Sequence, residues 1–222
     1  MDVFEFITKV SVRAIPILSA ITLPEVAHGW MARCFGDRTA EMLGRLSLNP
    51  LRHVDPVGTL LVPGLLLFIG APVFGWAKPV PVATGGLRKP RTAAIVVALA
   101  GPAANLLMAA MWCAVLAAIA RSNVYETLDY WIEFMAQAGI VINVMLAVLK
   151  LLPIPPLDGG RILATLLPPR AAVRFERVEA FGLLIVLGLV VLPPFQPLLR
   201  LLFEPSLRAI GFVINSVMRP SA

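Results

Sequence analysis

Residues 92–120 form the longest uncharged stretch of the chain and read TAAIVVALAGPAANLLMAAMWCAVLAAIA. A helix needs roughly 20 apolar residues to cross the hydrocarbon core of a bilayer. This stretch is longer than that and contains no acidic or basic side chain. Its length and composition therefore predict a membrane-spanning helix.

Three further uncharged stretches surround it, at residues 57–77, 134–149 and 180–199. The whole chain of 222 residues is 59% hydrophobic and 14% charged, and its mean hydropathy is +0.85. This composition is too apolar for a soluble domain of that length, and it disfavours the alternative of buried helices in a large soluble protein. We predict an all-α fold, namely a polytopic membrane helical bundle with about five or six spans.

Residues 57–77 differ from the other stretches because helix-breaking residues interrupt them. Pro63-Gly64 and Gly70-Ala71-Pro72 fall inside the stretch, and basic residues flank it on both sides. A straight span would place one of these basic flanks outside the cell, against the positive-inside rule. We therefore predict a bent or re-entrant segment here. Residues 1–222 are expected to form a single membrane-embedded domain.

The net charge of +6 reflects basic clusters next to the apolar stretches. Basic residues precede residues 92–120 and residues 180–199, whereas the segment 121–133 is acidic on balance. This distribution fits membrane anchoring, with the basic loops in the cytoplasm. The basic clusters do not resemble a nucleic-acid-binding face with interleaved aromatic residues, so no nucleic-acid partner is expected. The basic clusters are Arg88, Lys89 and Arg91, and Arg170, Arg174 and Arg177.

Three ionisable residues lie within or next to apolar segments, where charge is costly and usually serves a function. Glu25 and His28 are three positions apart and share a helix face. Asp158 follows a proline-rich break. A His, a Glu and an Asp on separate apolar elements form a set suited to metal-assisted hydrolysis. Two simpler interpretations remain open: an interhelical hydrogen-bonded pair for Glu25 and His28, and a helix N-cap for Asp158.

The segment around Glu25 matches part of the zinc-binding helix His-Glu-x-x-His. In that motif the two histidines bind zinc, and the glutamate polarises a metal-bound water. This chain reads Pro24-Glu25-Val26-Ala27-His28. A proline side chain has no donor atom for a metal, so the residue at the position of the first ligand cannot bind zinc.

Five segments, in order over residues 15–165, carry a further likeness. On these segments the chain resembles the site-2 protease family of intramembrane zinc metalloproteases, and in particular its compact bacterial members. The resemblance covers about two thirds of the chain, and it rests on the order of the segments more than on any one of them. The segments are 25–29 (EVAHG), 48–59 (LNPLRHVDPVGT), 74–82 (FGWAKPVPV), 100–105 (AGPAAN) and 152–161 (LPIPPLDGGR).

The resemblance implies a role for each matching residue. Zinc would be bound by His28 and Asp158, with Glu25 as the catalytic base and Pro24 at the position of the missing histidine ligand. The family's asparagine near the active site, which helps to position substrate, is Lys150 here. Lys150 is then expected either to position substrate, to supply a positive charge in place of zinc, or to extend to the membrane interface.

His53 and Asp55 lie in a segment that the resemblance places beside the metal site without binding the metal. His53 is the other histidine of the chain, and its substitution for the missing ligand is the less favoured alternative.

The expected function is that of a site-2-type intramembrane zinc metalloprotease with a degenerate zinc motif, which hydrolyses peptide bonds in transmembrane segments. The alternative is an inactive pseudoprotease that binds transmembrane partners on the same fold, so whether the chain is an enzyme stays open. A transporter or channel is disfavoured because the sequence has no inverted repeats. The expected partners are membrane lipid and a transmembrane peptide or protein. The expected location is the bacterial inner membrane, with the site near the cytoplasmic side.

Overall fold

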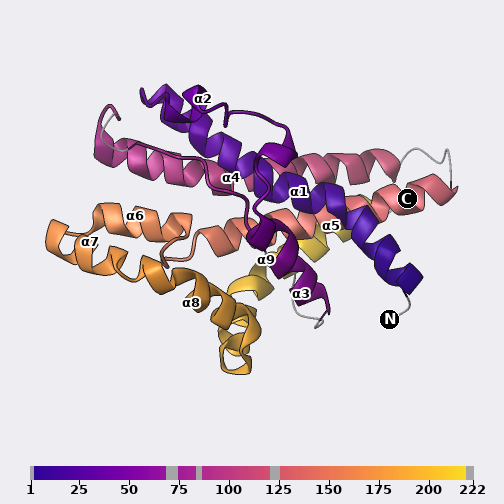
Figure 1. Ribbon diagram of the computed structural model, residues 1–222. Coiled ribbons are helices and arrows are strands. Elements are labelled where there is room, and N and C mark those ends of the chain that lie inside the picture. Colours follow the sequence, from indigo (N-terminus) through magenta and orange to yellow (C-terminus); the bar gives the residue numbers. More distant parts are fainter. Residues whose placement is uncertain (1–2, 69–74, 84–86, 121–125, 219–222) are drawn as a thin grey trace.

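The computed structural model describes residues 3–68, 75–83, 87–120 and 126–218, and every regular element within them is helical. The prediction of an all-α fold is therefore confirmed for these residues (Figure 1). The α-helices are α1 (Val3–Cys34), α2 (Thr39–Met42), α3 (Val62–Phe68), α4 (Pro90–Ile119), α5 (Glu126–Lys150), α6 (Asp158–Leu166), α7 (Pro169–Glu176), α8 (Glu179–Val191) and α9 (Gln196–Met218). Two short 3₁₀ turns, η1 (Pro50–Arg52) and η4 (Pro193–Phe195), and one π-helical turn, η2 (Pro56–Leu61), complete the set.

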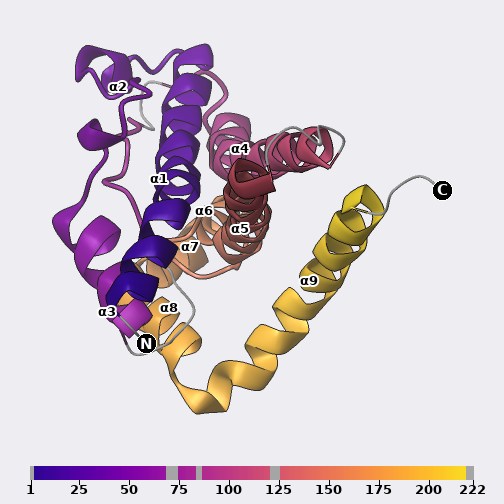
Figure 2. The ribbon, with the colours of Figure 1, turned by 90° about the vertical axis from the view of Figure 1, so that its right-hand side faces the viewer.

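Helices α1, α4 and α5 form the centre of the molecule, and each of them packs against the other two (Figures 1 and 2). Asn105 of α4 joins all three. Its side-chain amide donates to the carbonyl of Ala20 in α1 at 2.9 Å and to the side-chain oxygen of Asn143 in α5 at 3.0 Å. Both asparagines are fully buried. Because buried polar groups need partners, these bonds favour one arrangement of the three helices.

Two helical segments have the length and apolarity needed to cross a membrane, namely α4 and residues 131–150 of α5. Helix α8 has 13 residues. At about 1.5 Å per residue it is roughly 20 Å long, shorter than the hydrocarbon core of a bilayer. The number of five or six spans therefore stays a prediction.

The segment from Pro56 to Val82 leaves the body of the protein and returns to it. It begins with η2 and α3, and residues 75–83 run back as an extended segment without regular secondary structure. The Trp76 N–H donates to the carbonyl of Gly58 at 3.0 Å, and the Thr59 hydroxyl donates to the carbonyl of Trp76 at 2.9 Å. The two ends of the segment thus meet, as a re-entrant hairpin requires. The turn of the predicted hairpin, at 69–74, lies outside the described residues.

Helices α6, α8 and α9 pack around the central three. Helix α9 packs on α4 and α5, opposite α1 (Figure 2). Ile210 of α9 lies in one buried cluster with Leu116 of α4 and Ile140 of α5. Val186 and Leu189 of α8 form a second cluster with residues at the end of α5. Helix α6 packs on α4, and this contact brings Asp158 to the protein interior.

Candidate active site

His28 and Asp158 meet inside the protein. The His28 Nε2 lies 3.3 Å from the Asp158 Oδ2, and the two residues are only 3% and 6% exposed. The His28 Nδ1 lies 2.7 Å from the carbonyl of Val97 in α4. A carbonyl can only accept, so Nδ1 carries a proton. In the neutral imidazole the lone pair of Nε2 then faces a carboxylate, and either a second proton or a bound cation is needed between them.

Gly101 of α4 makes room for this pair. A Cβ atom at residue 101 would overlap the His28 ring and would lie 3.0 Å from the Asp158 Oδ2. Glycine is thus required where α1 and α6 approach α4 on the same side.

Asp158 is the first residue of α6, and Leu157 occupies the N-cap position without a side-chain cap. The alternative interpretation of Asp158 as an N-cap is therefore wrong. Its carboxylate still benefits from the positive end of the helix dipole, as any acidic residue in a first turn does. The side chain is turned inward toward His28 instead of capping α6.

Glu25 lies one turn before His28 on α1 and is held by two groups from other segments. Its Oε2 accepts from the backbone N–H of Val80 at 3.1 Å, and its Oε1 lies 3.8 Å from the Lys150 Nζ at the end of α5. The two side chains are 17% and 16% exposed, and the Nζ atom itself is buried. Lys150 therefore points to Glu25 and does not extend to the membrane interface.

A cavity of about 330 Å³ lies between α1, α5 and α6, and Glu25, Lys150 and Asp158 all line it. Trp76, Ala77 and Pro79 of the extended segment form part of its wall, beside apolar residues of α1, α5 and α8. Glu25, Lys150 and Asp158 thus share one largely apolar space, and His28 is not among the residues that line it. The apolar residues are Ile21, Leu146, Leu149 and Val186, and the further charged ones are Arg161 and Glu179.

This chain is similar to proteins that are named as zinc metalloproteases. The sequence profile described as Peptidase family M50 matches residues 118–193. A Bacillus subtilis protein named "Putative zinc metalloprotease YwhC" is 37% identical over 181 residues, which are 81% of this chain and 80% of that protein. The chain belongs to peptidase family M50, the site-2 protease family.

Two mycobacterial relatives agree with this assignment. The protein named "Putative zinc metalloprotease Rip2" from Mycolicibacterium smegmatis is 32% identical over 178 residues, and that from Mycobacterium tuberculosis is 30% identical over 176 residues. Each match covers 79% of this chain and 65% of the relative. Family M50 proteins are embedded in membranes. No solved structure is detectably similar to this chain.

A catalytic zinc site usually has three protein ligands and one water. Here His28 and Asp158 supply two donors, and Pro24, at the position of the motif's first histidine, is buried and has none. No three His, Cys, Asp or Glu side chains of the described residues are grouped to hold a metal ion. The described residues therefore do not fit a three-ligand zinc site.

His53 and Asp55, predicted to lie beside the metal site, bind other partners. The His53 Nε2 lies 2.8 Å from the carbonyl of Ser47, and the Asp55 carboxylate caps η2 by accepting from the N–H groups of Val57 and Gly58. Neither residue lines the 330 Å³ cavity. Both instead order the loop that leads into the hairpin segment.

Sequence reasoning missed several groups that position the site. The Val97 carbonyl and the Val80 N–H are backbone atoms, so no residue type could have revealed them. Gly101 lies in one of the segments of the resemblance, but the sequence does not show that His28 and Asp158 approach it. Arg161 and Glu179, which also line the cavity, resemble ordinary flanking charges in the sequence.

Proposed function

We propose that this chain is a site-2-type membrane protein that binds apolar segments of other membrane proteins without hydrolysing them. The observation that carries the proposal is the 3.8 Å approach of the Lys150 ammonium to the Glu25 carboxylate, together with a buried proline at the ligand position. In a working enzyme Glu25 would accept a proton from a metal-bound water. Here the Lys150 ammonium lies beside the Glu25 carboxylate.

The charges of the cavity support this proposal. Buried carboxylates are costly unless a cation accompanies them. Zinc would normally serve Glu25 and Asp158 in this way. Lys150 provides a positive charge beside Glu25. On the other side, a proton between the His28 Nε2 and the Asp158 Oδ2, which lie 3.3 Å apart, would take the place of the metal. The cavity can then persist without a metal, and its apolar walls suit an aliphatic or aromatic side chain of a transmembrane segment.

The second candidate is a hydrolase with a weak, two-ligand zinc site. It is favoured by the His28 Nε2, which is buried without a hydrogen-bond partner and faces the Asp158 carboxylate. A metal bound there would have two protein ligands, and its affinity would be low because catalytic zinc ordinarily has three. This candidate corresponds to the family's intramembrane proteolysis.

We place the site in the cytoplasmic half of a bacterial inner membrane. The segments rich in arginine and lysine are the end of α1 with the following loop, the start of α4, and α7, and all lie at one end of the molecule (Figure 1, left). The acidic start of α5 lies at the opposite end. The positive-inside rule makes the basic end cytoplasmic. The relatives named above are also bacterial.

Zinc content and cleavage together test the proposal. We would purify the unaltered chain, Pro24→His, Lys150→Asn and the double variant, and measure zinc and cleavage of a model transmembrane peptide. We expect little zinc and no cleavage for the unaltered chain, and about one zinc per chain with cleavage for the double variant. Adding Glu25→Gln to the double variant should keep the zinc and abolish cleavage. Stoichiometric zinc with cleavage in the unaltered chain would establish the second candidate instead.

Binding is tested separately with a variant that fills the cavity. Leu146→Trp places a larger side chain on the cavity wall, whereas Leu106→Trp does so on an exposed face of α4. We expect only Leu146→Trp to reduce cross-linking of a photoreactive transmembrane peptide. Equal cross-linking by both variants would show that the peptide does not enter the cavity.

A further inference from the structure

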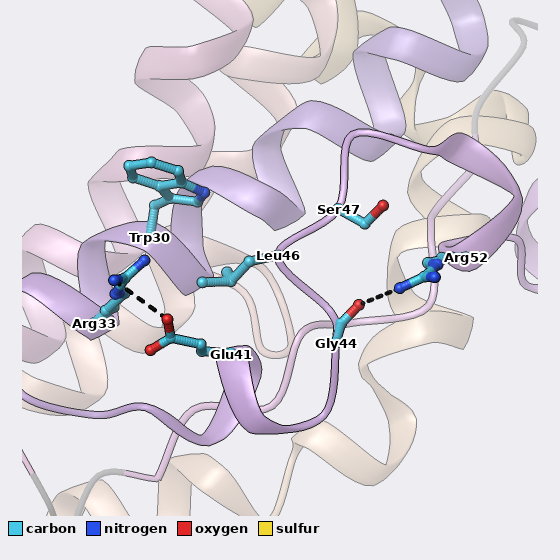
Figure 3. A pocket seen from close by; sticks show the side chains of 7 residues that line it. All are labelled: Trp30, Arg33, Glu41, Gly44, Leu46, Ser47 and Arg52. Atoms are coloured by element: carbon cyan, nitrogen blue, oxygen red, sulfur yellow. Dashed lines mark hydrogen bonds and ion pairs between the residues drawn. The ribbon is translucent and has the colours of Figure 1, made fainter.

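A second cavity, of about 390 Å³, lies at the end of α1, away from the residues of the candidate active site. Figure 3 shows Trp30 and Arg33 of α1 on one wall and Ser47 and Arg52 of the following loop on the other. Nothing in the proposed function uses this cavity. We propose that it binds the phosphate headgroup of an anionic phospholipid.

The cavity has an excess of positive charge. Arg33 pairs with Glu41 at 3.2 Å, and Arg52 donates to the carbonyl of Gly44 at 3.2 Å. A carbonyl does not neutralise a guanidinium, and no carboxylate of the described residues forms an ion pair with Arg52. Arginine is the side chain that best matches phosphate, because its planar fork can donate two parallel hydrogen bonds. The Ser47 hydroxyl offers a further donor on the same wall as Arg52.

A third arginine keeps the loop in place without entering the cavity. Arg45 donates to the carbonyl of Arg52 at 2.5 Å and to the carbonyl of Lys78 at 2.9 Å. Both acceptors are backbone atoms. Arg45 therefore holds the loop through backbone atoms. Arg52 adds one hydrogen bond to the Gly44 carbonyl, and its guanidinium has further N–H donors for a ligand.

Exposed apolar side chains next to the cavity identify the ligand as a lipid. Large apolar side chains that are exposed together usually mark contact with a membrane or a partner. The indole of Trp30, 56% exposed, suits the level of the lipid headgroups, and the Arg33 guanidinium lies 6.0 Å from its ring centre. A lipid supplies both the anion and the acyl chains that these side chains need. The exposed large apolar residues from the end of α2 to η1 are Met42 (77%), Leu43 (62%), Leu48 (70%) and Leu51 (77%).

Native mass spectrometry of the full chain in detergent tests this site with phosphatidylglycerol and phosphatidylcholine of the same acyl chains. We expect the unaltered chain to retain phosphatidylglycerol in preference to phosphatidylcholine. Arg52→Gln should weaken retention about fivefold, the share expected of one cation near an anionic lipid. Glu41→Gln should strengthen it, because Arg33 loses its competing carboxylate. Arg208→Gln, which removes an exposed arginine from α9, should have no effect.

The opposite signs expected for Arg52→Gln and Glu41→Gln separate loss of the site from loss of folding. Unchanged phosphatidylglycerol retention in both variants would overturn the proposal. Displacement of the lipid by millimolar inorganic phosphate would assign the cavity to a free anion, and displacement by a poly-glutamate peptide would assign it to a protein partner. Either result would also overturn the proposal. The zinc and cleavage measurements are independent of all these outcomes.

Discussion

Asn105 donates a hydrogen bond to the Ala20 carbonyl, the group that Pro24 leaves without its helical partner. In an uninterrupted α-helix the N–H of residue 24 would bond the carbonyl of residue 20, but proline has no N–H. The Asn105 amide takes its place from a neighbouring helix. Helix α1 can thus continue through Pro24.

This relationship predicts that the effects of Pro24 and Asn105 substitutions are coupled. Asn105→Ala should lower the free energy of unfolding by about 1–3 kcal/mol, because it leaves buried polar groups unpaired. In a Pro24→His background the helix regains an N–H for Ala20, so the same substitution should cost less. Thermal unfolding of the four proteins in detergent measures the coupling. Strictly additive effects would show that Asn105 does not compensate for the proline.

Gly101→Ala should disturb the paired His28 and Asp158. The added Cβ would overlap the His28 ring, and we expect a loss of stability of about 1–3 kcal/mol. Gly64→Ala in α3 is the matched control, because a Cβ there meets nothing within 4 Å. The control should be neutral or slightly stabilising. Equal unfolding temperatures for the two variants would contradict the close packing at Gly101.

Lys150→Met should destabilise the protein by on the order of 2 kcal/mol, because it leaves the Glu25 carboxylate largely buried without a cation. Glu25→Gln in the same chain should restore most of this loss. The exposed pair of Arg208 and Glu204 is the control, and its removal should leave the unfolding temperature unchanged. A Lys150→Met variant as stable as the unaltered chain would mean that the Lys150 charge is not needed in the cavity.

The hydrogen bonds of the Asp37 carboxylate predict that the folded protein loses stability in acid. Burial alone would raise the pKa of this carboxyl, but hydrogen bonds from the Thr39 hydroxyl and from the N–H groups of Thr39 and Ala83 lower it below its ordinary value of 3.8. A lowered pKa in the folded state stabilises the protein above pH 3.8, and this contribution is lost as the pH falls through the folded-state pKa.

The Asp37→Asn variant should therefore unfold at a lower temperature than the unaltered chain at neutral pH, and the difference should shrink in acid. Thermal unfolding as a function of pH measures it. A difference that is constant down to the most acid pH would mean that the Asp37 charge does not contribute.

The amino-acid sequence by itself determined the class of fold and identified the residues that could take part in catalysis or metal binding. Long uncharged stretches predict membrane helices because apolarity over some 20 residues is a local property of the chain. The three-residue spacing of Glu25 and His28 predicts a shared helix face for the same reason. The missing ligand at Pro24 is likewise visible without any structure.

Tertiary structure alone decided which of these groups meet. His28 faces Asp158 because Gly101 lets α1 and α6 approach α4, and Lys150 reaches Glu25 because α5 ends beside α1. His53 and Asp55 instead form hydrogen bonds within their own loop. Such pairings depend on how distant helices pack, and helix packing depends on side-chain shape along whole interfaces. No spacing between residues encodes it.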